Sequence, residues 1–241
     1  KLTKAFQDAY EQVLALHANG PKEDGLTAGE KARRAAVRTE LDQGRPAVVR
    51  WDFRNAPEED RAIVKHVMAA AKIVERIFAK QRGVADAERD LAPDDPAGRM
   101  LFYRNQSPFC EQPKTEGDPA CSALPGKVKK MSGMYPASVQ QDPKFCETLA
   151  KNPDSKALFY QFATIAEEGG KLTAVPYTVA YKEEMTAISA GLKKAADGIA
   201  NPAEAPLKAY LGAAAQAFVD NDWPKADEAW AAMNVSNSKY Y

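Results

Sequence analysis

The stretch that decides the fold is TVAYKEEMTAISAGLKKAADGIANP, residues 178–202. Its apolar residues recur at spacings of three, four, three and four residues, which is the period of one face of an α-helix. These residues are Met185, Ile188, Leu192, Ala195 and Ile199. Asn201 and Pro202 follow, and proline lacks the N–H that a continuing helix needs. The stretch therefore predicts a long helix that buries one face and ends near residue 200.

The same period predicts helices along most of the chain. Thr27 and Glu30 have the spacing of a capping box at a helix start. Pro57 stands before three acidic residues, which favour the positive end of a helix dipole. After Pro153, a stripe of Leu158, Phe162 and Ile165 predicts a helix that Gly169 ends. The predicted helices span about 2–17, 27–42, 57–82, a short segment from Pro143, 153–168, 178–200, 203–219 and 224–233.

The remaining segments are irregular or extended in character. Residues 84–142 are rich in proline and predict loops, whereas 47–53 and 171–177 read as short extended segments. The tail 234–241 has a β-like composition. The sequence therefore predicts a mainly α fold, an irregular multi-helix domain with a loop-rich middle. We divide it into 1–142 and 143–241, which together form one continuous structural unit.

Composition excludes two classes of partner. The 241 residues carry 33 basic and 33 acidic side chains, without the basic excess that general nucleic-acid binding requires. The longest apolar run, at 67–74, is far shorter than the roughly 20 residues that span a bilayer. The chain opens in an amphipathic helix without an initiator methionine, which is typical of a mature or trimmed product. We expect neither nucleic acid nor a membrane span.

Three cysteines indicate the redox environment. Cys110 and Cys121 bracket a loop of proline, glycine and charged residues that has little core of its own. We predict a disulfide between them, which would stabilise the fold by about 3 kcal/mol and indicate an oxidising compartment, periplasmic or secreted. The alternative is three unpaired thiols in a cytosolic protein. We expect Cys146 to be a small core residue on a short helix or to pair outside this chain.

Most catalytic signatures are absent from the sequence. There is no glycine-rich phosphate loop. A zinc-binding helix needs two histidines four residues apart beside a glutamate, and the chain has only His17 and His66, far apart. Adjacent carboxylates such as Glu58 and Glu59 point about 100° apart on a helix and predict solvated faces rather than an acid–base pair. We therefore predict no catalytic residue, no metal ligand and no cofactor in this chain.

Three segments, in order, resemble one protein family. They are AAAKIVERIFAKQ (69–81), LFYRNQSPF (101–109) and the longer run 172–230. The last has a Pro-Tyr pair, a later tyrosine, a long helix, Asn-Pro, and then Asn-Asp-aromatic followed by Asp-x-x-Trp. Together these segments resemble dipeptidyl peptidase III-like proteins, and also the peptidase-like domain fused to some plant Nudix-type hydrolases.

The resemblance implies a zinc metallopeptidase, of which this chain is the amino-terminal helical part. The family's His-Glu zinc helix and its downstream glutamate have no counterpart in these residues. We therefore expect zinc in the intact parent, a missing carboxy-terminal zinc lobe or a partner chain as the binding partner, and a peptide as the substrate. This hydrolase fragment is not expected to be active alone. The alternative function is a non-catalytic helical module that binds a peptide or a protein.

The junction 217–230, AFVDNDWPKADEAW, supplies the candidate contact residues. Asp220, Asn221 and Asp222 can end one helix and cap the next. Large rings at such a junction either fill the core or line a surface where a second lobe docks. Our candidates for cleft or lobe contacts come from this junction and from the Pro-Tyr segment. They are Tyr177, Tyr181, Trp223, Asp227 and Trp230.

The disulfide is tested by intact mass before and after reduction. With one disulfide, reduction adds two hydrogens, and alkylation under denaturing conditions without reductant labels Cys146 alone. Labelling of all three cysteines before reduction would contradict the predicted pairing.

Overall fold

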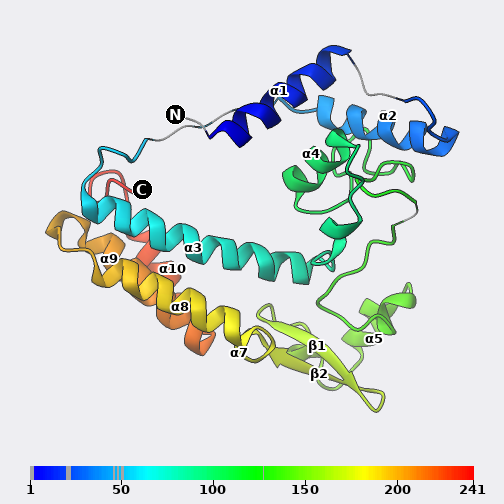
Figure 1. Cartoon of the computed structure of the whole chain (residues 1–241). Coiled ribbons are helices and arrows are strands. Elements are labelled where there is room, and N and C mark those ends of the chain that lie inside the picture. The colour runs from blue at the N-terminus through cyan, green and yellow to red at the C-terminus, as the bar shows by residue number, and fades with distance from the viewer. Residues whose placement is uncertain (1–2, 20–22, 46, 48, 50–51, 127) are drawn as a thin grey trace. The chain divides into compact units, whose positions relative to one another are not determined.

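A computed structural model describes residues 3–19, 23–45, 47, 49, 52–126 and 128–241. It is mainly α-helical, with one two-stranded sheet in the described residues, as the sequence predicts (Figure 1). The chain forms two compact units, residues 1–48 with 82–131 and residues 49–81 with 132–241. Neither unit is one continuous stretch, and the helix after Pro57 packs with the carboxy-terminal helices.

The second unit is built on three long helices that lie side by side (Figure 1). They are α3 (Glu58–Gln81), α8 (Lys182–Asp197) and α9 (Ala205–Asp220). All five residues of the stripe that defines the fold are buried, so the predicted buried face is confirmed. The helix is shorter than the predicted 178–200, because it begins after Tyr181 and ends before Ile199. α8 packs against both α3 and α9. The apolar face of α8 is therefore the centre of this unit.

Small residues let these helices approach closely. The position that a Cβ on Gly191 would occupy lies 3.7 Å from the Cβ of Ala70 on α3. On the α9 side, the Ser189 hydroxyl donates a hydrogen bond of 2.7 Å to the carbonyl of Ala215. Asn201 caps a short 3₁₀ helix, η3 (Pro202–Glu204), between α8 and α9. The short helix α10 (Pro224–Ala231) buries Ala226 in the same core.

The predicted helix over 153–168 is wrong in its second half. α5 (Phe145–Ala150) and the single turn α6 (Ser155–Leu158) are followed by β1 (Ala163–Glu168), which pairs antiparallel with β2 (Lys171–Pro176). Gly169 and Gly170 have φ of 58° and 79°, the two left-handed residues that a tight hairpin turn requires. The glycines thus reverse the chain, and Ile165 faces Leu158 and Leu149 in a small core. The extended segment at 171–177 is confirmed over β2, and α7 (Tyr177–Ala180) leads from it into α8.

The first unit contains α1 (Lys4–Asn19), α2 (Ala28–Asp42), the 3₁₀ helix η1 (Ala87–Asp90) and α4 (Pro96–Asn105). Thr27 accepts a hydrogen bond from the Glu30 N–H and caps α2 as predicted, but the Glu30 side chain bonds to arginines instead of completing the capping box. The prediction of loops throughout 84–142 is wrong for α4. Asp95 caps this helix and Pro96 stands in its first turn.

The cysteines are partly as predicted. Cys110 and Cys121 form a disulfide with their Cα atoms 5.8 Å apart, both buried. Cys146 is exposed on α5, so the prediction of a core position is wrong. The stripe of that short helix buries Leu149 instead.

The tail after α10 forms turns rather than the predicted β-like structure. Asn234 and Asn237 form local hydrogen bonds within these turns, and the residues that follow bond to charged side chains of the second unit. Ser238 donates to buried Glu204 at 2.7 Å, and the Lys239 ammonium pairs with Asp60 at 2.7 Å. Because these bonds fix the backbone locally, no partner strand forms here within the described residues.

Two predictions fall partly outside the described residues. In the segment 47–53, residues 48, 50 and 51 lie outside them, as does the side chain of His17.

In the part of the chain that is described, none of the helices is long and apolar enough to cross a bilayer. A short 3₁₀ helix, η2 (Val139–Gln141), completes the regular elements.

Because α8 is central to this unit, shortening a buried side chain of its apolar stripe should lower the stability of the protein. Ile188 is 1% exposed, so Ile188→Ala should lower the free energy of unfolding by about 2–5 kcal/mol, through lost burial and the cavity left behind. The control Val219→Ala, at a position 58% exposed, should change it by less than about 0.5 kcal/mol. Urea denaturation of both variants measures the difference, and equal effects would contradict the assignment of the core.

Candidate functional site

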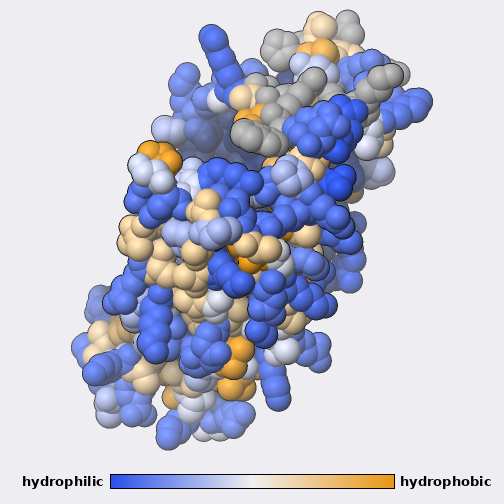
Figure 2. Space-filling view, turned by 90° about the vertical axis from the view of Figure 1, so that its left-hand side faces the viewer, coloured by the Kyte–Doolittle hydropathy of each residue, from blue (hydrophilic) through white to orange (hydrophobic). Residues whose placement is uncertain are grey.

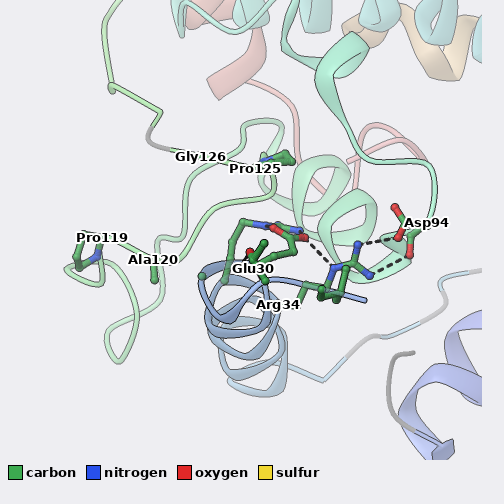
Figure 3. Close-up of a pocket in the computed structure, with 11 residues that line it drawn as sticks. Glu30, Arg34, Asp94, Pro119, Ala120, Pro125 and Gly126 are labelled. Carbon is green, nitrogen blue, oxygen red and sulfur yellow. Dashed lines mark hydrogen bonds and ion pairs between the residues drawn. The ribbon is translucent and has the colours of Figure 1, made fainter. Parts of the chain in front are cut away.

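A cleft lies in the first unit, at the amino-terminal end of α2. Its volume is about 810 Å³. α2 contributes its first turns, the residues before α4 form one wall, and the segments around the disulfide form the other (Figure 3). Proline, alanine and glycine line much of it, with a few charged groups. The lining residues are Leu26, Thr27, Gly29, Glu30, Arg33, Arg34, Asp94, Pro119, Ala120, Pro125 and Gly126.

Two buried arginines organise the charge in this cleft. Arg33 donates to Glu30 at 2.6 and 2.8 Å and to the carbonyl of Ser122 at 2.6 Å. Arg34 donates to Glu30 at 2.8 Å and to the Asp94 carboxylate at 2.9 Å, the two contacts drawn in Figure 3. Glu30 thus accepts hydrogen bonds from both guanidinium groups. These bonds replace the hydrogen bonds to water that the two buried arginines lose on folding.

Asp95 joins α4 to the same network. Its carboxylate pairs with Arg33 and accepts a hydrogen bond of 2.9 Å from the N–H of Gly98. A Cβ on Gly98 would lie 2.4 Å from Asp95 Oδ2 and 2.9 Å from the carbonyl of Ala123, so only glycine fits there. One carboxylate therefore caps α4 and holds it against α2.

The electrostatics of the cleft follow from these pairs. The hydrogen bonds from Arg33 lower the pKa of Glu30 most, and those from Arg34 add to the effect. Burial would raise this pKa, but the hydrogen bonds are stronger and lower it from its ordinary 4.5 to about 2. The Arg34 hydrogen bond also lowers the pKa of Asp94. A carboxylate held ionised in this way is a poor proton donor or acceptor near neutral pH. The geometry indicates a structural ion network beside an apolar cleft, not an acid–base centre.

A second buried carboxylate fixes the disulfide loop. Glu40 is fully buried on α2 and accepts hydrogen bonds from the N–H groups of Glu111 and Gln112 at 3.2 and 3.1 Å. Thr115 donates its hydroxyl to it, and Arg104 of α4 pairs with it at 2.5 Å. Burial alone would raise the pKa of Glu40, but these bonds, with Thr115 the strongest, lower it. Glu40 therefore ties α2, α4 and the loop together.

The described residues do not fit a zinc ion. Zinc in proteins takes thiolate, imidazole and carboxylate ligands in a tetrahedral arrangement. Among the described residues, one group of three such side chains comes together, namely Glu40, Cys110 and Cys121. Its two sulfurs are joined to each other, and its carboxylate is occupied by hydrogen bonds. This donor set is therefore a structural junction.

Three of the predicted contact residues come together in the second unit. The rings of Tyr177 and Tyr181 are tilted against each other with centroids 5.4 Å apart. Phe162 links Tyr177, at 6.3 Å, to Trp223, at 5.5 Å. Phe218 completes the set, 4.9 Å from Trp223. We call these five rings the aromatic cluster. It joins the hairpin, α7 and the α9–α10 junction, and burial raises the pKa of both tyrosines.

The other two predicted residues lie outside the aromatic cluster. Asp227 is exposed on α10, and Trp230 is 59% exposed. Tyr181, by contrast, is only 6% exposed. The five candidates thus divide into an inner set that packs and an outer pair on α10 that faces solvent. Their roles in contacting a cleft or lobe stay predictions.

The junction itself is built by Asn221. It adopts a left-handed conformation, φ 62°, that ends α9, and its amide donates to the carbonyl of Phe162 at 3.1 Å. Asp220 accepts from the N–H of Asp222 at 3.0 Å, but no side chain caps α10. Of the predicted caps, the end of α9 is therefore right and the start of α10 is wrong.

The ion network in the first unit could not be predicted from the sequence. Arg33, Arg34 and Glu40 lie on one helix, where nothing in the local sequence marks them as buried, yet all three are buried. The one local signal was a proline-rich loop between two cysteines, which needs polar partners for its backbone. The residue that supplies them lies about 70 positions away.

Two solved structures share this fold. Dipeptidyl peptidase III from Caldithrix abyssi is 29% identical to the chain, with a TM-score of 0.63 over 82% of this chain and 38% of that one. Dipeptidyl-peptidase III from Corallococcus sp. strain EGB is 23% identical, with a TM-score of 0.67 over 85% of this chain and 38% of that one. No protein-family model and no curated protein matches.

These matches confirm the resemblance read from the three sequence segments. Over most of its length the chain has the fold of part of dipeptidyl peptidase III. It spans about 38% of the length of the two structures it matches. The similarity therefore concerns the fold of one part of dipeptidyl peptidase III.

Glu30 should make the stability of this unit depend on pH. Its folded pKa lies below its ordinary value, so its contribution is complete above about pH 4.5 and is lost as the pH falls towards 2. At about 1.4 kcal/mol per pH unit, the contribution is on the order of 3 kcal/mol. Glu30→Gln should destabilise the protein at pH 7 and weaken the acid dependence. The control is Glu116→Gln, at an exposed position of the same unit, and equal pH profiles for all three proteins would contradict the network.

Proposed function

We propose that this chain is the part without zinc ligands of a dipeptidyl peptidase III-like metallopeptidase. The single observation that supports it is the match of more than four-fifths of the chain to dipeptidyl peptidase III from two bacterial sources. In the intact parent, the reaction would be the hydrolysis of peptide bonds. The amino-terminal position within that parent, inferred from the order of the three sequence segments, is part of the same proposal.

The metal would come from outside these residues. The family resemblance implies zinc, whereas the described residues bring together only a donor group whose sulfurs are already bonded to each other. A missing zinc lobe or a partner chain must then carry the ligands. This chain would supply a body for that lobe to dock on and one wall of the cleft that receives the peptide.

The outer pair on α10 is the best candidate for that wall. Asp227 and Trp230 lie on one short helix and are exposed. Trp230 offers a large ring and an N–H donor, the combination found where protein surfaces bind partners. Tyr177, Tyr181 and Trp223 would act one layer below, by holding the α9–α10 junction in place.

A non-catalytic binding module is the second candidate. The observation that favours it is the exposure of apolar residues around the end of the helical unit, namely Trp230 and Val235 at 59% and 81%. On the face drawn in Figure 2, hydrophobic atoms occur in small groups among hydrophilic side chains. In this case the same surface would bind a peptide or protein without cleaving it.

The disulfide supports export as part of the proposal. Disulfides persist in oxidising compartments and are rare in the cytosol, and Cys110 and Cys121 are paired and buried. We place the protein in a periplasm or outside the cell.

The test compares the 241-residue chain with the polypeptide encoded by its full reading frame. A synthetic peptide with a free amino terminus is incubated with each, and released dipeptides are followed by mass spectrometry. The parent should release them in the presence of zinc and stop after chelation, while the chain alone should release none. An amino-terminally acetylated peptide serves as the control substrate.

The alternative predicts different results. A reading frame that ends at Tyr241, together with saturable binding of an uncleaved peptide, would replace the peptidase by the binding module. Trp230→Ala should weaken that binding at least about tenfold, while Val219→Ala, on the neighbouring helix, should not.

A further inference from the structure

The register of the hairpin fixes the direction of each backbone group of β2. The N–H of Tyr177 donates to the carbonyl of Phe162 at 3.0 Å, and the pairing continues with Thr164 opposite Val175. In an antiparallel pair, hydrogen-bonded positions alternate. Thr173 and Val175 therefore direct their N–H and C=O groups at β1. Leu172 and Ala174 direct theirs away from it.

The two outer edges of the hairpin differ. On β1, the outward N–H of Ile165 donates to the carbonyl of Met134 at 2.8 Å, and that of Ala163 donates to Tyr160 at 3.2 Å. On β2, the outward N–H groups of Leu172 and Ala174 have no hydrogen-bond acceptor among the described residues. One edge is thus closed by the chain itself and the other is open.

A pocket lies on the face of the hairpin that packs against α6, and both strands line it, since Ala163 of β1 is part of its wall as well. It has a volume of about 570 Å³ and lies between the hairpin and the turn α6. Ala174 and Pro176 of β2 form part of its wall, opposite Ala157 and Tyr160. An extended segment paired with β2 would place every second side chain on this face of the sheet. The outward backbone groups of β2 and the pocket are therefore both suited to an extended polypeptide segment.

We propose that the open edge of β2 pairs with an extended strand of the parent polypeptide from outside residues 1–241, with one side chain of that strand in the pocket. The proposal rests on the proposed function, because it needs a longer parent. It names the chemistry of the contact, which is a backbone ladder to Leu172 and Ala174. The hairpin is then part of a larger sheet in the parent.

The size of the edge favours a covalently connected strand. Only two residues offer an outward N–H, since Pro176 has none and the turn with Gly169 ends the other side. So few hydrogen bonds do not offset the translational and rotational freedom that a separate chain loses on binding. A strand of the same polypeptide is already at high effective concentration. The short edge and the charges beside the turn, Glu168 and Lys171, also oppose pairing between copies.

Amide hydrogen exchange, measured by NMR on both polypeptides, tests the proposal. In the 241-residue chain, Thr173 and Val175 should be protected, while Leu172 and Ala174 exchange at least about tenfold faster. In the parent, all four should be protected. The inward residues serve as an internal control that the hairpin is folded.

A proline variant removes the outward donor without touching the ladder to β1. Ala174→Pro should leave Thr173 and Val175 protected in both polypeptides and abolish the protection of Leu172 in the parent. Ala174→Ser, which keeps the N–H, should behave like the wild type.

Each remaining outcome overturns the proposal in a recognisable way. A parent that releases dipeptides but leaves Leu172 and Ala174 exchanging freely refutes the strand and keeps the peptidase. Protection in the 241-residue chain that grows with its concentration assigns the edge to a second copy. Protection in the parent only after a substrate peptide is added assigns it to that peptide. A reading frame that ends at Tyr241 refutes both proposals.

Discussion

The apolar stripe of α8 is the constraint on which the second unit depends. Its residues face α3 on one side and α9 on the other, so the burial of one helix fixes the positions of two more. Glycine and alanine at the α3 crossing bring the backbones close, and the contact to α9 satisfies the hydroxyl of Ser189. Because α7 joins α8 directly to β2, the hairpin is also held at the end of this helix. The aromatic cluster then seals the hairpin against the α9–α10 junction.

The first unit is stabilised differently. Its loops are too rich in proline and charge to build a large apolar core, and the structure compensates with a disulfide and buried carboxylates. Buried charges stabilise a fold only when their partners meet all of their hydrogen-bonding capacity. Glu40 meets this condition with backbone N–H groups and Arg104, and Asp95 meets it with Arg33 and the N–H of Gly98. The loop is thereby fixed by polar contacts in addition to the small apolar cluster that its two cysteines join.

These two solutions bear on function. The strongest electrostatic features of the described residues serve to hold segments together, and they hold carboxylates ionised. The features that remain for recognition are an apolar cleft, an exposed pair on α10, and one open strand edge. The proposed function assigns to such a body the support and recognition of a substrate, with metal ligands outside these residues. Its fold, shared with part of dipeptidyl peptidase III, supports the same interpretation.

The sequence by itself determined the long helices and their buried faces, because a period of three to four apolar residues has one physical solution. It also determined the disulfide, since two cysteines bracketed a loop without a core.

It did not determine the hairpin, where a stripe of Leu158, Phe162 and Ile165 has the spacing of a helix and only the two left-handed glycines turn it into paired strands. Nor did it determine which charges are buried. Glu40 and Arg33 look like any solvated helix residues until α4 and the disulfide loop, distant in sequence, close over them. The partners of a buried charge are supplied by the tertiary structure alone, because its desolvation is offset by groups that no local pattern contains.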